Sequence, residues 1–171
     1  GPLGRILTGE RTALNFLCHL SGVATLTAAF AARIRDTGVR VLDTRKTTPG
    51  LRALEKKAVA DGGGKNHRHD LASYILVKEN HIAAAGGVGA VLERLGEFLS
   101  GCEIEVRELD ELRVLSGNPP GRIMLDNFMP ARIGEAVDMI RSWERVPEIE
   151  VSGGITLENI SAYAVEGVDY I

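Results

Sequence analysis

Residues 39–70 read VRVLDTRKTTPGLRALEKKAVADGGGKNHRHD, and this stretch decides how the rest of the sequence is interpreted. Its mostly apolar start predicts a short buried strand. Thr48 and Pro49 then predict the start of a helix, because threonine is a favoured N-cap and proline a favoured first helical residue. Three glycines at 62–64 end that helix. The stretch therefore predicts one strand–helix unit.

Two cationic clusters flank the predicted helix. Arg45 and Lys46 follow the strand, and His67 and Arg68 follow the glycines. Cations at the carboxyl end of a strand, beside a helix N-terminus, suit a ligand that carries several negative charges. The alternative is a solvated loop in which these cations form local salt bridges.

The composition is that of one globular domain. The 171 residues are 44% apolar and carry a formal net charge of −3. A weakly acidic chain with local basic clusters points to a small anionic ligand rather than to nucleic acid. No run reaches the roughly 20 uninterrupted apolar residues of a membrane span, so no membrane partner is predicted. Cys18 and Cys102 are too few for a disulfide framework and are predicted to pack in the core of a cytoplasmic protein.

A regular alternation of strands and helices follows an N-terminal helical segment, residues 1–38. Within that segment the apolar periodicity predicts two helical pieces, interrupted at Ser21 and Gly22. Strands are predicted at 39–43, 74–78, 102–107, 122–126, 148–152 and 168–171, and helices at about 49–60, 88–99, 109–115, 130–143 and 157–165. This spacing is typical of βα units in a parallel sheet. It fits either an open doubly wound sheet or an incomplete barrel.

Polar residues near the strand ends favour the barrel. Functional groups that come from the carboxyl ends of many strands are typical of a barrel active site, whereas an open sheet gathers them at one switch point. The residues in question are Arg45, Lys46, Lys78, Glu105, Asp126, Ser152, Gly153 and Gly154. We therefore predict an α/β fold in which residues 39–171 form an incomplete (β/α) barrel of parallel strands, similar to a TIM barrel.

Three strand-end residues can take part in chemistry. Lys78 ends an apolar strand, where it can contact a phosphate, form a Schiff base or face solvent. Glu105 faces the same side as Glu103, because side chains alternate along a strand. Asp126 ends the next strand and is well placed to join Glu105. Two such carboxylates can hold Mg²⁺, directly or through water, or stabilise positive charge on a sugar. The alternative is a salt bridge to Lys46 or Lys78.

The Ser152-Gly153-Gly154 segment lies between a predicted strand and a helix that Thr156 is predicted to cap. Small residues let backbone N–H groups approach a phosphate closely, and a helix start adds its dipole. Late barrel loops commonly bind phosphate. The segment is therefore a candidate phosphate loop.

Seven segments, taken together and in this order, resemble the catalytic domain of the quinolinate phosphoribosyltransferases, also called carboxylating nicotinate-nucleotide pyrophosphorylases. The resemblance covers nearly the whole chain. The segments are residues 10–15 (ERTALN), 43–50 (DTRKTTPG), 62–68 (GGGKNHR), 78–81 (KENH), 103–106 (EIEV), 125–127 (LDN) and 151–156 (VSGGIT).

The resemblance implies a pentosyltransferase of NAD biosynthesis. Such an enzyme converts quinolinate and phosphoribosyl pyrophosphate, with Mg²⁺, to nicotinate mononucleotide, pyrophosphate and CO₂, and it works as a homodimer with shared active sites. The resemblance implies the following roles: Arg45, His67 and Arg68 bind the quinolinate carboxylates, Arg11 reaches the partner's site, Lys46 and Lys78 contact substrate charge, Glu105 and Asp126 serve the ribose and Mg²⁺, and Ser152 and Gly153 hold the 5′-phosphate.

Three alternatives stay open. They are a paralogous phosphoribosyltransferase of the same fold, a Schiff-base aldolase that uses Lys78, and a dimerisation module without activity. The family also carries an amino-terminal domain and continues beyond a point that matches Ile171, where the sequence ends within a predicted strand. We therefore expect the 171-residue chain to be a fragment with little or no turnover when it is expressed alone.

Overall fold

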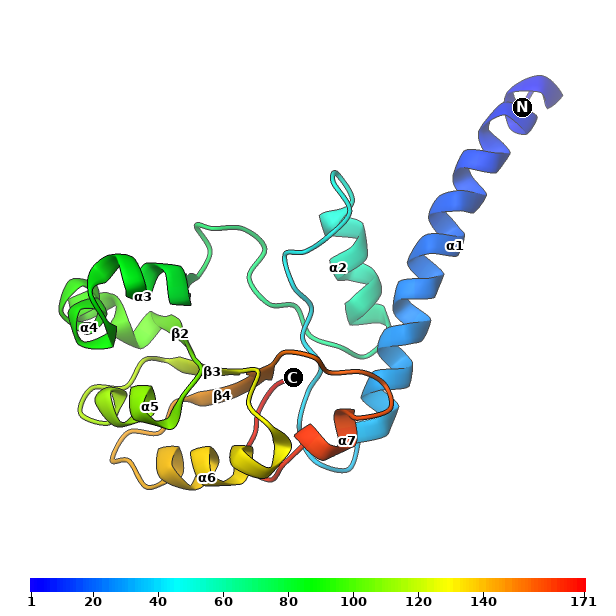
Figure 1. Cartoon of the computed structure of the whole chain (residues 1–171). Coiled ribbons are helices and arrows are strands. Elements are labelled where there is room, and N and C mark those ends of the chain that lie inside the picture. Colours follow the sequence, from blue (N-terminus) through cyan, green and yellow to red (C-terminus); the bar gives the residue numbers. More distant parts are fainter. The chain divides into compact units, whose positions relative to one another are not determined.

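The computed structural model describes residues 1–171 and divides the chain into two compact units (Figure 1). Unit 1 comprises residues 1–32 and 41–69, and unit 2 comprises residues 33–40 and 70–171. The elements are α1 (Leu3–Ile34), α2 (Arg52–Asp61), β1 (Ile75–Val77), α3 (Glu79–Ala85), α4 (Val88–Leu95), the 3₁₀ helix η1 (Gly96–Gly101), β2 (Cys102–Val106), α5 (Leu109–Leu115), β3 (Arg122–Asp126), α6 (Pro130–Arg141), β4 (Glu148–Ser152) and α7 (Ile160–Tyr163).

Helix α1 is one continuous helix of 32 residues. The predicted interruption at Ser21 and Gly22 is therefore wrong. A glycine inside a helix costs only about 1 kcal/mol, and the alanine- and leucine-rich turns around it can offset that cost. Cys18, predicted to lie in the core, is exposed on this helix.

Much of the apolar surface of α1 is exposed. The exposed large apolar residues of this helix are Leu3, Ile6, Leu7, Leu14, Phe16, Leu17 and Leu26. By length and composition alone the helix could cross a membrane, although no uninterrupted apolar run of that length occurs in it. Core helices of soluble proteins and signal sequences meet the same two criteria, so this property is weak support for a membrane span.

The glycine run of unit 1 packs against α1. A Cβ atom added at Gly62 would lie 2.4 Å from the carbonyl oxygen of Ala24, and one added at Gly64 would lie 2.9 Å from Thr27 Cγ2. The sequence indicated only that these glycines end a helix. The structure adds that they let the chain pass directly over α1 as it leaves α2.

Unit 2 is built on a parallel sheet of four strands in the order β1-β2-β3-β4. The strands predicted at 122–126 and 148–152 match β3 and β4, and β1 and β2 are slightly shorter than predicted. The strands alternate with helices along the chain, and Figure 1 shows α5 and α6 beside the sheet. The α/β class and the parallel arrangement of the strands that the sequence predicted are therefore confirmed.

One face of the sheet carries apolar side chains that pack in the core, and the other carries charged side chains. On β2, Ile104 and Val106 are fully buried together with apolar residues of the neighbouring strands and of α5 and α6. Glu103 and Glu105 alternate with them and therefore face the opposite side. The register continues this arrangement, because Glu103 is paired with Arg122 on β3.

The outermost predicted strands are reduced to isolated bridges. Arg40 pairs with Tyr170, which also pairs with Glu150 of β4, so unit 2 extends its sheet by short parallel contacts. In unit 1, Leu42 pairs with Lys65. The strands predicted at 39–43 and 168–171 are thus correct in direction but are not regular strands.

Several helix boundaries differ from those predicted. The helix expected to begin at Pro49 begins at Arg52, after a turn in which Leu51 N donates to Thr48 O at 3.0 Å. Helix α3 was not predicted, and the helix expected at 157–165 is the four-residue α7, so Thr156 is not its N-cap. Short polar segments gave no clear periodicity from which these ends could be placed.

The glycine packing in unit 1 makes a prediction about stability. Gly62→Ala should lower the free energy of unfolding by about 1–3 kcal/mol, because the added methyl group meets the backbone of α1. The backbone itself tolerates alanine, since φ at Gly62 is −80°. The measurement is urea unfolding followed by circular dichroism.

Gly22→Ala is the matched control, because a Cβ atom there meets nothing within 4 Å. It should raise the free energy of unfolding by about 0.5–1 kcal/mol through its better helix propensity. Equal effects of the two substitutions would contradict the packing described.

Candidate functional site

The candidate site residues fall into two groups, one in each unit. In unit 1, two loops run side by side, because Asp43 N donates to Lys65 O at 3.1 Å and Lys65 N donates to Val41 O at 2.8 Å. The first loop carries Arg45 and Lys46, and the second carries His67 and Arg68. The four residues that the sequence singled out are therefore held on adjacent loops.

Arg45 has a hydrogen-bond donor that the chain does not satisfy. Its Nε atom is buried and has no hydrogen-bond partner. Its carbonyl oxygen, in contrast, accepts from Thr47 N at 3.0 Å and from Arg52 Nη2 at 3.2 Å, so the backbone is fixed. A buried unpaired donor is costly, and a carboxylate or phosphate ligand would remove this cost.

The imidazole of His67 is oriented by its own backbone neighbour. Arg68 N donates to His67 Nδ1 at 2.7 Å. Because Nδ1 accepts this bond, the hydrogen-bond network assigns the proton of the neutral ring to Nε2. His67 and Arg68 are both half-buried, whereas Lys46 is exposed. Nε2–H of His67 is thus a fixed donor.

Arg11 does not join this group within unit 1. It is exposed on α1, whose first half projects beyond α2 in Figure 1. His19, further along the same helix, instead contacts α2, where its Nε2 lies 2.7 Å from Glu55 Oε1. Hydrogen bonds from Thr48 and His19 lower the pKa of Glu55, which keeps this carboxylate ionised.

In unit 2, the strand ends bring Lys78, Glu105 and Asp126 together. Lys78 Nζ donates to Glu105 Oε2 at 2.5 Å, and the Glu105 side chain is only 3% exposed. Burial raises the pKa of Glu105, while the hydrogen bond from Lys78 acts in the opposite direction. The salt bridge between Lys78 and Glu105, which the sequence analysis gave as an alternative, is present.

Arg107 is a member of this group that the sequence analysis missed. Its Nε donates to Asp126 Oδ2 at 3.2 Å, and its Nη2 lies 3.6 Å from Glu105 Oε1. The same Nη2 atom lies 3.7 Å from Glu79 Oε2. The available signal was the alternation along β2, because Arg107 follows Glu103 and Glu105 on the same face.

The predicted phosphate loop meets the end of β3. Asn127 N donates to Ser152 O at 2.7 Å, and Asn127 Nδ2 donates to Asp126 Oδ2 at 2.8 Å. Gly153 has φ +104°, and a Cβ atom there would lie 2.3 Å from Asn127 Oδ1. Glycine is therefore required at this position, and the loop lies directly beside Asp126. Helix α7 begins only at Ile160, so a helix dipole does not support this loop.

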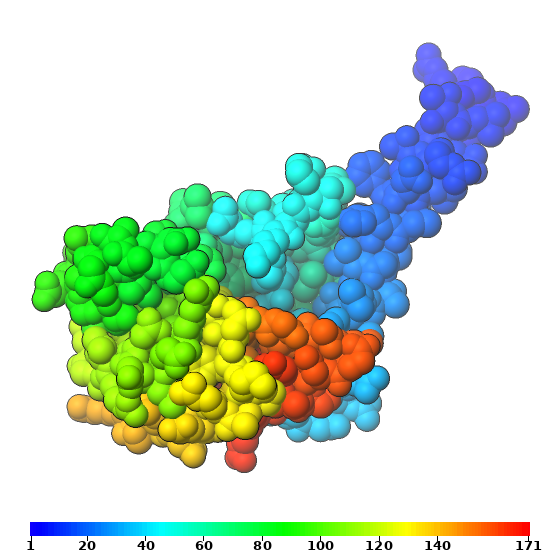
Figure 2. Space-filling model, in the orientation of Figure 1, coloured from blue at the N-terminus to red at the C-terminus, as the bar shows by residue number.

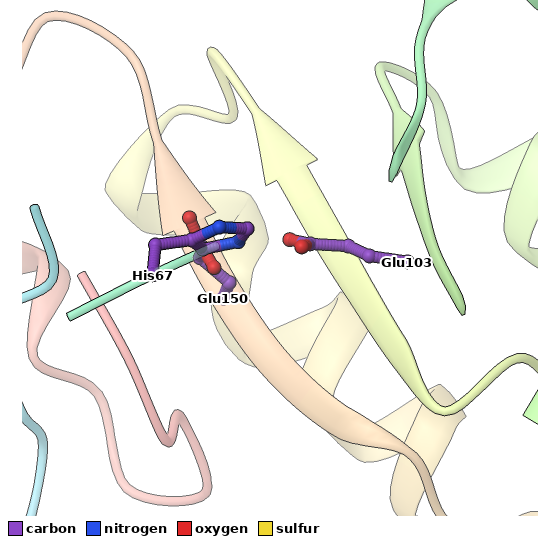
Figure 3. A group of neighbouring side chains, drawn as sticks. All are labelled: His67, Glu103 and Glu150. Carbon is purple, nitrogen blue, oxygen red and sulfur yellow. The ribbon is translucent and has the colours of Figure 1, made fainter. Parts of the chain in front are cut away.

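Below the strand ends, the same face of the sheet carries further charges. Figure 3 shows the Glu103 side chain directed across β3 toward Glu150. Arg122 Nη1 donates to Glu150 Oε2 at 3.2 Å, and Arg122 Cζ lies 4.3 Å from the centre of the Tyr170 ring. Burial, followed by the nearby Glu103, raises the pKa of Glu150 to about 8. Glu150 therefore retains a proton near neutral pH.

Comparisons with known proteins place this geometry in a family. The family description "Quinolinate phosphoribosyl transferase, C-terminal domain" matches residues 23–171. The chain belongs to this family. The incomplete barrel predicted from the sequence is the fold that its solved relatives share.

Two curated relatives and two solved structures illustrate the likeness. The chain is 46% identical over 170 residues to the "Nicotinate-nucleotide pyrophosphorylase [carboxylating]" of Mycobacterium leprae, an alignment that covers 97% of the chain and 59% of the relative. It is 46% identical over 180 residues to a probable enzyme of that name from Methanocaldococcus jannaschii, covering 100% of the chain and 63% of the relative.

The structure of NadC from Streptococcus pyogenes aligns with a TM-score of 0.89 at 41% identity and covers 99% of the chain and 60% of that protein. The nicotinate-nucleotide pyrophosphorylase from Francisella tularensis aligns with a TM-score of 0.87 at 43% identity, covering 96% and 59%. The chain thus spans about three fifths of the length of these relatives.

The buried Glu150 gives a testable dependence of stability on pH. Its folded-state pKa of about 8 lies above the ordinary value of 4.5, so the folded state holds a proton that the unfolded state releases first. Between these pH values the free energy of unfolding should fall as pH rises, by up to about 1.4 kcal/mol per pH unit. Glu150→Gln should flatten this slope in urea unfolding at pH 5, 6, 7 and 8. Parallel slopes for the variant and the parent would show that Glu150 is ionised like an ordinary carboxylate.

Proposed function

We propose that the chain is the catalytic part of an enzyme that transfers the phosphoribosyl group of phosphoribosyl pyrophosphate to quinolinate, with loss of CO₂. The products are nicotinate mononucleotide and pyrophosphate, and the reaction belongs to NAD biosynthesis. The observation that carries the proposal is the family match over residues 23–171, which includes both groups of site residues except Arg11.

The cationic loops of unit 1 are proposed to bind quinolinate. This substrate carries two carboxylates on a flat pyridine ring, and guanidinium groups pair with carboxylates through two parallel hydrogen bonds. Arg45 and Arg68 supply such groups, and His67 adds a ring N–H donor whose orientation is fixed by the hydrogen bond from Arg68 N. The unsatisfied Nε of Arg45 supports this assignment, because it has a donor free for an incoming anion.

The strand ends of unit 2 are proposed to serve the phosphoribosyl group. Bond formation joins the pyridine nitrogen to the ribosyl carbon while the bond from that carbon to pyrophosphate breaks, so positive charge develops on the sugar. The carboxylates of Glu105 and Asp126 can stabilise that charge, and Lys78 can stabilise the leaving pyrophosphate. Lys46, on the cationic loops of unit 1, is proposed to contact substrate charge there. Ser152 and Gly153 would hold the 5′-phosphate beside Asp126.

The later loss of CO₂ needs little from the protein beyond a firm hold on the ring. Once the nitrogen is alkylated it carries a positive charge. The electron pair of the breaking bond to the 2-carboxylate can then remain at the ring carbon, which afterwards takes a proton from water. The remaining carboxylate stays bound by the cationic loops.

Mg²⁺ is part of this proposal. The oxygen donors of Glu105 and Asp126 are of the kind that Mg²⁺ prefers, and Asp126 uses only Oδ2 for its hydrogen bonds to Arg107 and Asn127. Glu105 already pairs with Lys78, so contact through water is the better fit at that residue. The ion would neutralise the pyrophosphate and so make it a better leaving group.

A cytoplasmic homodimer with shared active sites completes the proposal. The exposed apolar residues of α1 support it, because large apolar patches typically mark interfaces. Arg11 lies on this exposed helix and so could reach a second subunit. Sedimentation velocity tests this part of the proposal, and a monomer at micromolar concentration would contradict it.

The structure gives less support to a Schiff-base aldolase. Such an enzyme needs a neutral lysine amine as its nucleophile. Lys78 Nζ instead donates to the buried carboxylate of Glu105, so this nitrogen is held in an ion pair and is not free to attack a carbonyl carbon. A paralogue that acts on nicotinate is a closer alternative, and comparing the two pyridine substrates distinguishes it.

Calorimetric titration of quinolinate tests the substrate assignment. The parent chain and an Arg68→Ala variant are compared, and a second titration uses nicotinate. We expect binding to the parent to weaken as salt rises, because charges at a partly exposed site are screened. Loss of one carboxylate–guanidinium pair should weaken binding by about tenfold or more.

Arg35→Ala is the matched control, because the Arg35 side chain is 76% exposed and pairs only with its neighbour Asp36. It should bind quinolinate like the parent. Titration is repeated with any further residues that the gene encodes on either side. Equal binding of nicotinate, or no binding of quinolinate to that longer chain, would overturn the assignment.

A further inference from the structure

A buried ion pair in unit 1 lies beneath the two cationic loops. Lys56, on the inner side of α2, donates its Nζ to Asp43 Oδ1, and the two side chains are only 5% and 6% exposed. Neither residue carries a role in the reaction described above. Two charges taken out of water are costly, and a buried pair persists only if its remaining hydrogen-bonding groups are satisfied.

The pair is the centre of a closed hydrogen-bond network. Lys56 Nζ also donates to His67 O at 2.9 Å. Asp43 Oδ1 accepts from His67 N at 2.8 Å, and Asp43 Oδ2 accepts from Asn66 Nδ2 at 2.6 Å. The same Asn66 amide reaches Lys56 O at 2.9 Å. The start of the first cationic loop at Asp43, helix α2 and the second cationic loop are thus tied together at one place.

The network fixes both cationic loops with respect to each other. Arg45 follows Asp43 by two residues, and Arg68 directly follows His67, whose backbone N–H and C=O are both held by the network. A displacement of Asp43 or Lys56 would therefore change the spacing between the two guanidinium groups. A ligand with two carboxylates at a fixed separation is sensitive to that spacing.

The network also neutralises the negative charge of Asp43. The Asp43 carboxylate lies within the loops that are meant to bind an anion, and an uncompensated negative charge there would repel quinolinate. Lys56 cancels this charge from the side of α2. Lys57, the next residue along the helix, points to solvent, where its side chain is 70% exposed and pairs with Asp61. Burial of the ion pair is therefore particular to Lys56.

We propose that Lys56 is a positioning residue for the quinolinate site: through Asp43 it sets the spacing of the two cationic loops and removes a negative charge from beside them. The inference rests on the proposed function. Lys56 itself touches neither substrate. Its effect is on the dicarboxylate, whereas phosphoribosyl pyrophosphate is served mainly by unit 2.

The test uses the complete product of the gene that encodes this chain, with quinolinate and phosphoribosyl pyrophosphate varied separately. Lys56→Met keeps the length of the side chain and removes its charge. It should raise the KM for quinolinate by about tenfold or more, and the KM for phosphoribosyl pyrophosphate by less than about threefold. Lys57→Met, the matched control, should leave both KM values unchanged.

The double variant Asp43→Asn/Lys56→Met separates charge from folding. Removing both charges should recover part of the quinolinate affinity that Lys56→Met loses, since no uncompensated carboxylate remains. A loss that came only from unfolding would instead grow with the second substitution. If Lys56→Met does not fold, Asn66→Ala removes one arm of the network and should raise the quinolinate KM alone, by about threefold.

Three results would overturn the proposal: an unchanged quinolinate KM in folded Lys56→Met, an equal rise in both KM values, or an unchanged quinolinate KM in Asn66→Ala when Lys56→Met does not fold. These outcomes differ from a failure of the proposed function. In that case the parent enzyme itself would show no turnover with quinolinate.

Discussion

The structure of unit 2 depends on one constraint, the alternation of side chains along parallel strands that are in fixed register. Ile104, Ile123 and Ile149 are paired neighbours on three strands, and all are fully buried. Their neighbours Glu103, Arg122 and Glu148 must then face the other side together. A shift of one residue in any strand would exchange the two faces and would bury charges against the helices. The same constraint places Lys78, Glu105 and Asp126 at one edge.

Charge balance is the second requirement, and both units meet it in the same way. Two buried carboxylates beside candidate binding segments each pair with a cation from a neighbouring element: Glu105 pairs with Lys78, and Asp43 pairs with Lys56. Where a cation does not suffice, as at Glu150 beside Glu103, the carboxyl group retains a proton. The sites can therefore be charged and partly buried without losing stability. Figure 2 shows that the green, yellow and orange segments of unit 2 pack against one another on the visible face.

The sequence was most informative where local rules and tertiary structure agree. The strand-end residues could be located from the apolar runs that become β3 and β4 and from the alternation in β2. In a strand of fixed register, the position of each side chain determines the face of the sheet on which it lies. It was less informative where position depends on distant residues. Lys56 looks like its neighbour Lys57 in the sequence, and only the place of Asp43, thirteen residues earlier in the chain, makes it a buried residue. Likewise, the continuity of α1 through Gly22 was not evident from local propensity.

We propose that the strand ends and cationic loops of this chain serve decarboxylating phosphoribosyl transfer. The most direct measurement follows nicotinate mononucleotide, pyrophosphate and CO₂ together, using the complete gene product with quinolinate, phosphoribosyl pyrophosphate and Mg²⁺. We expect the three products to form in equal amounts and nicotinate not to replace quinolinate. Pyrophosphate release without CO₂, or turnover of nicotinate at a similar rate, would contradict it.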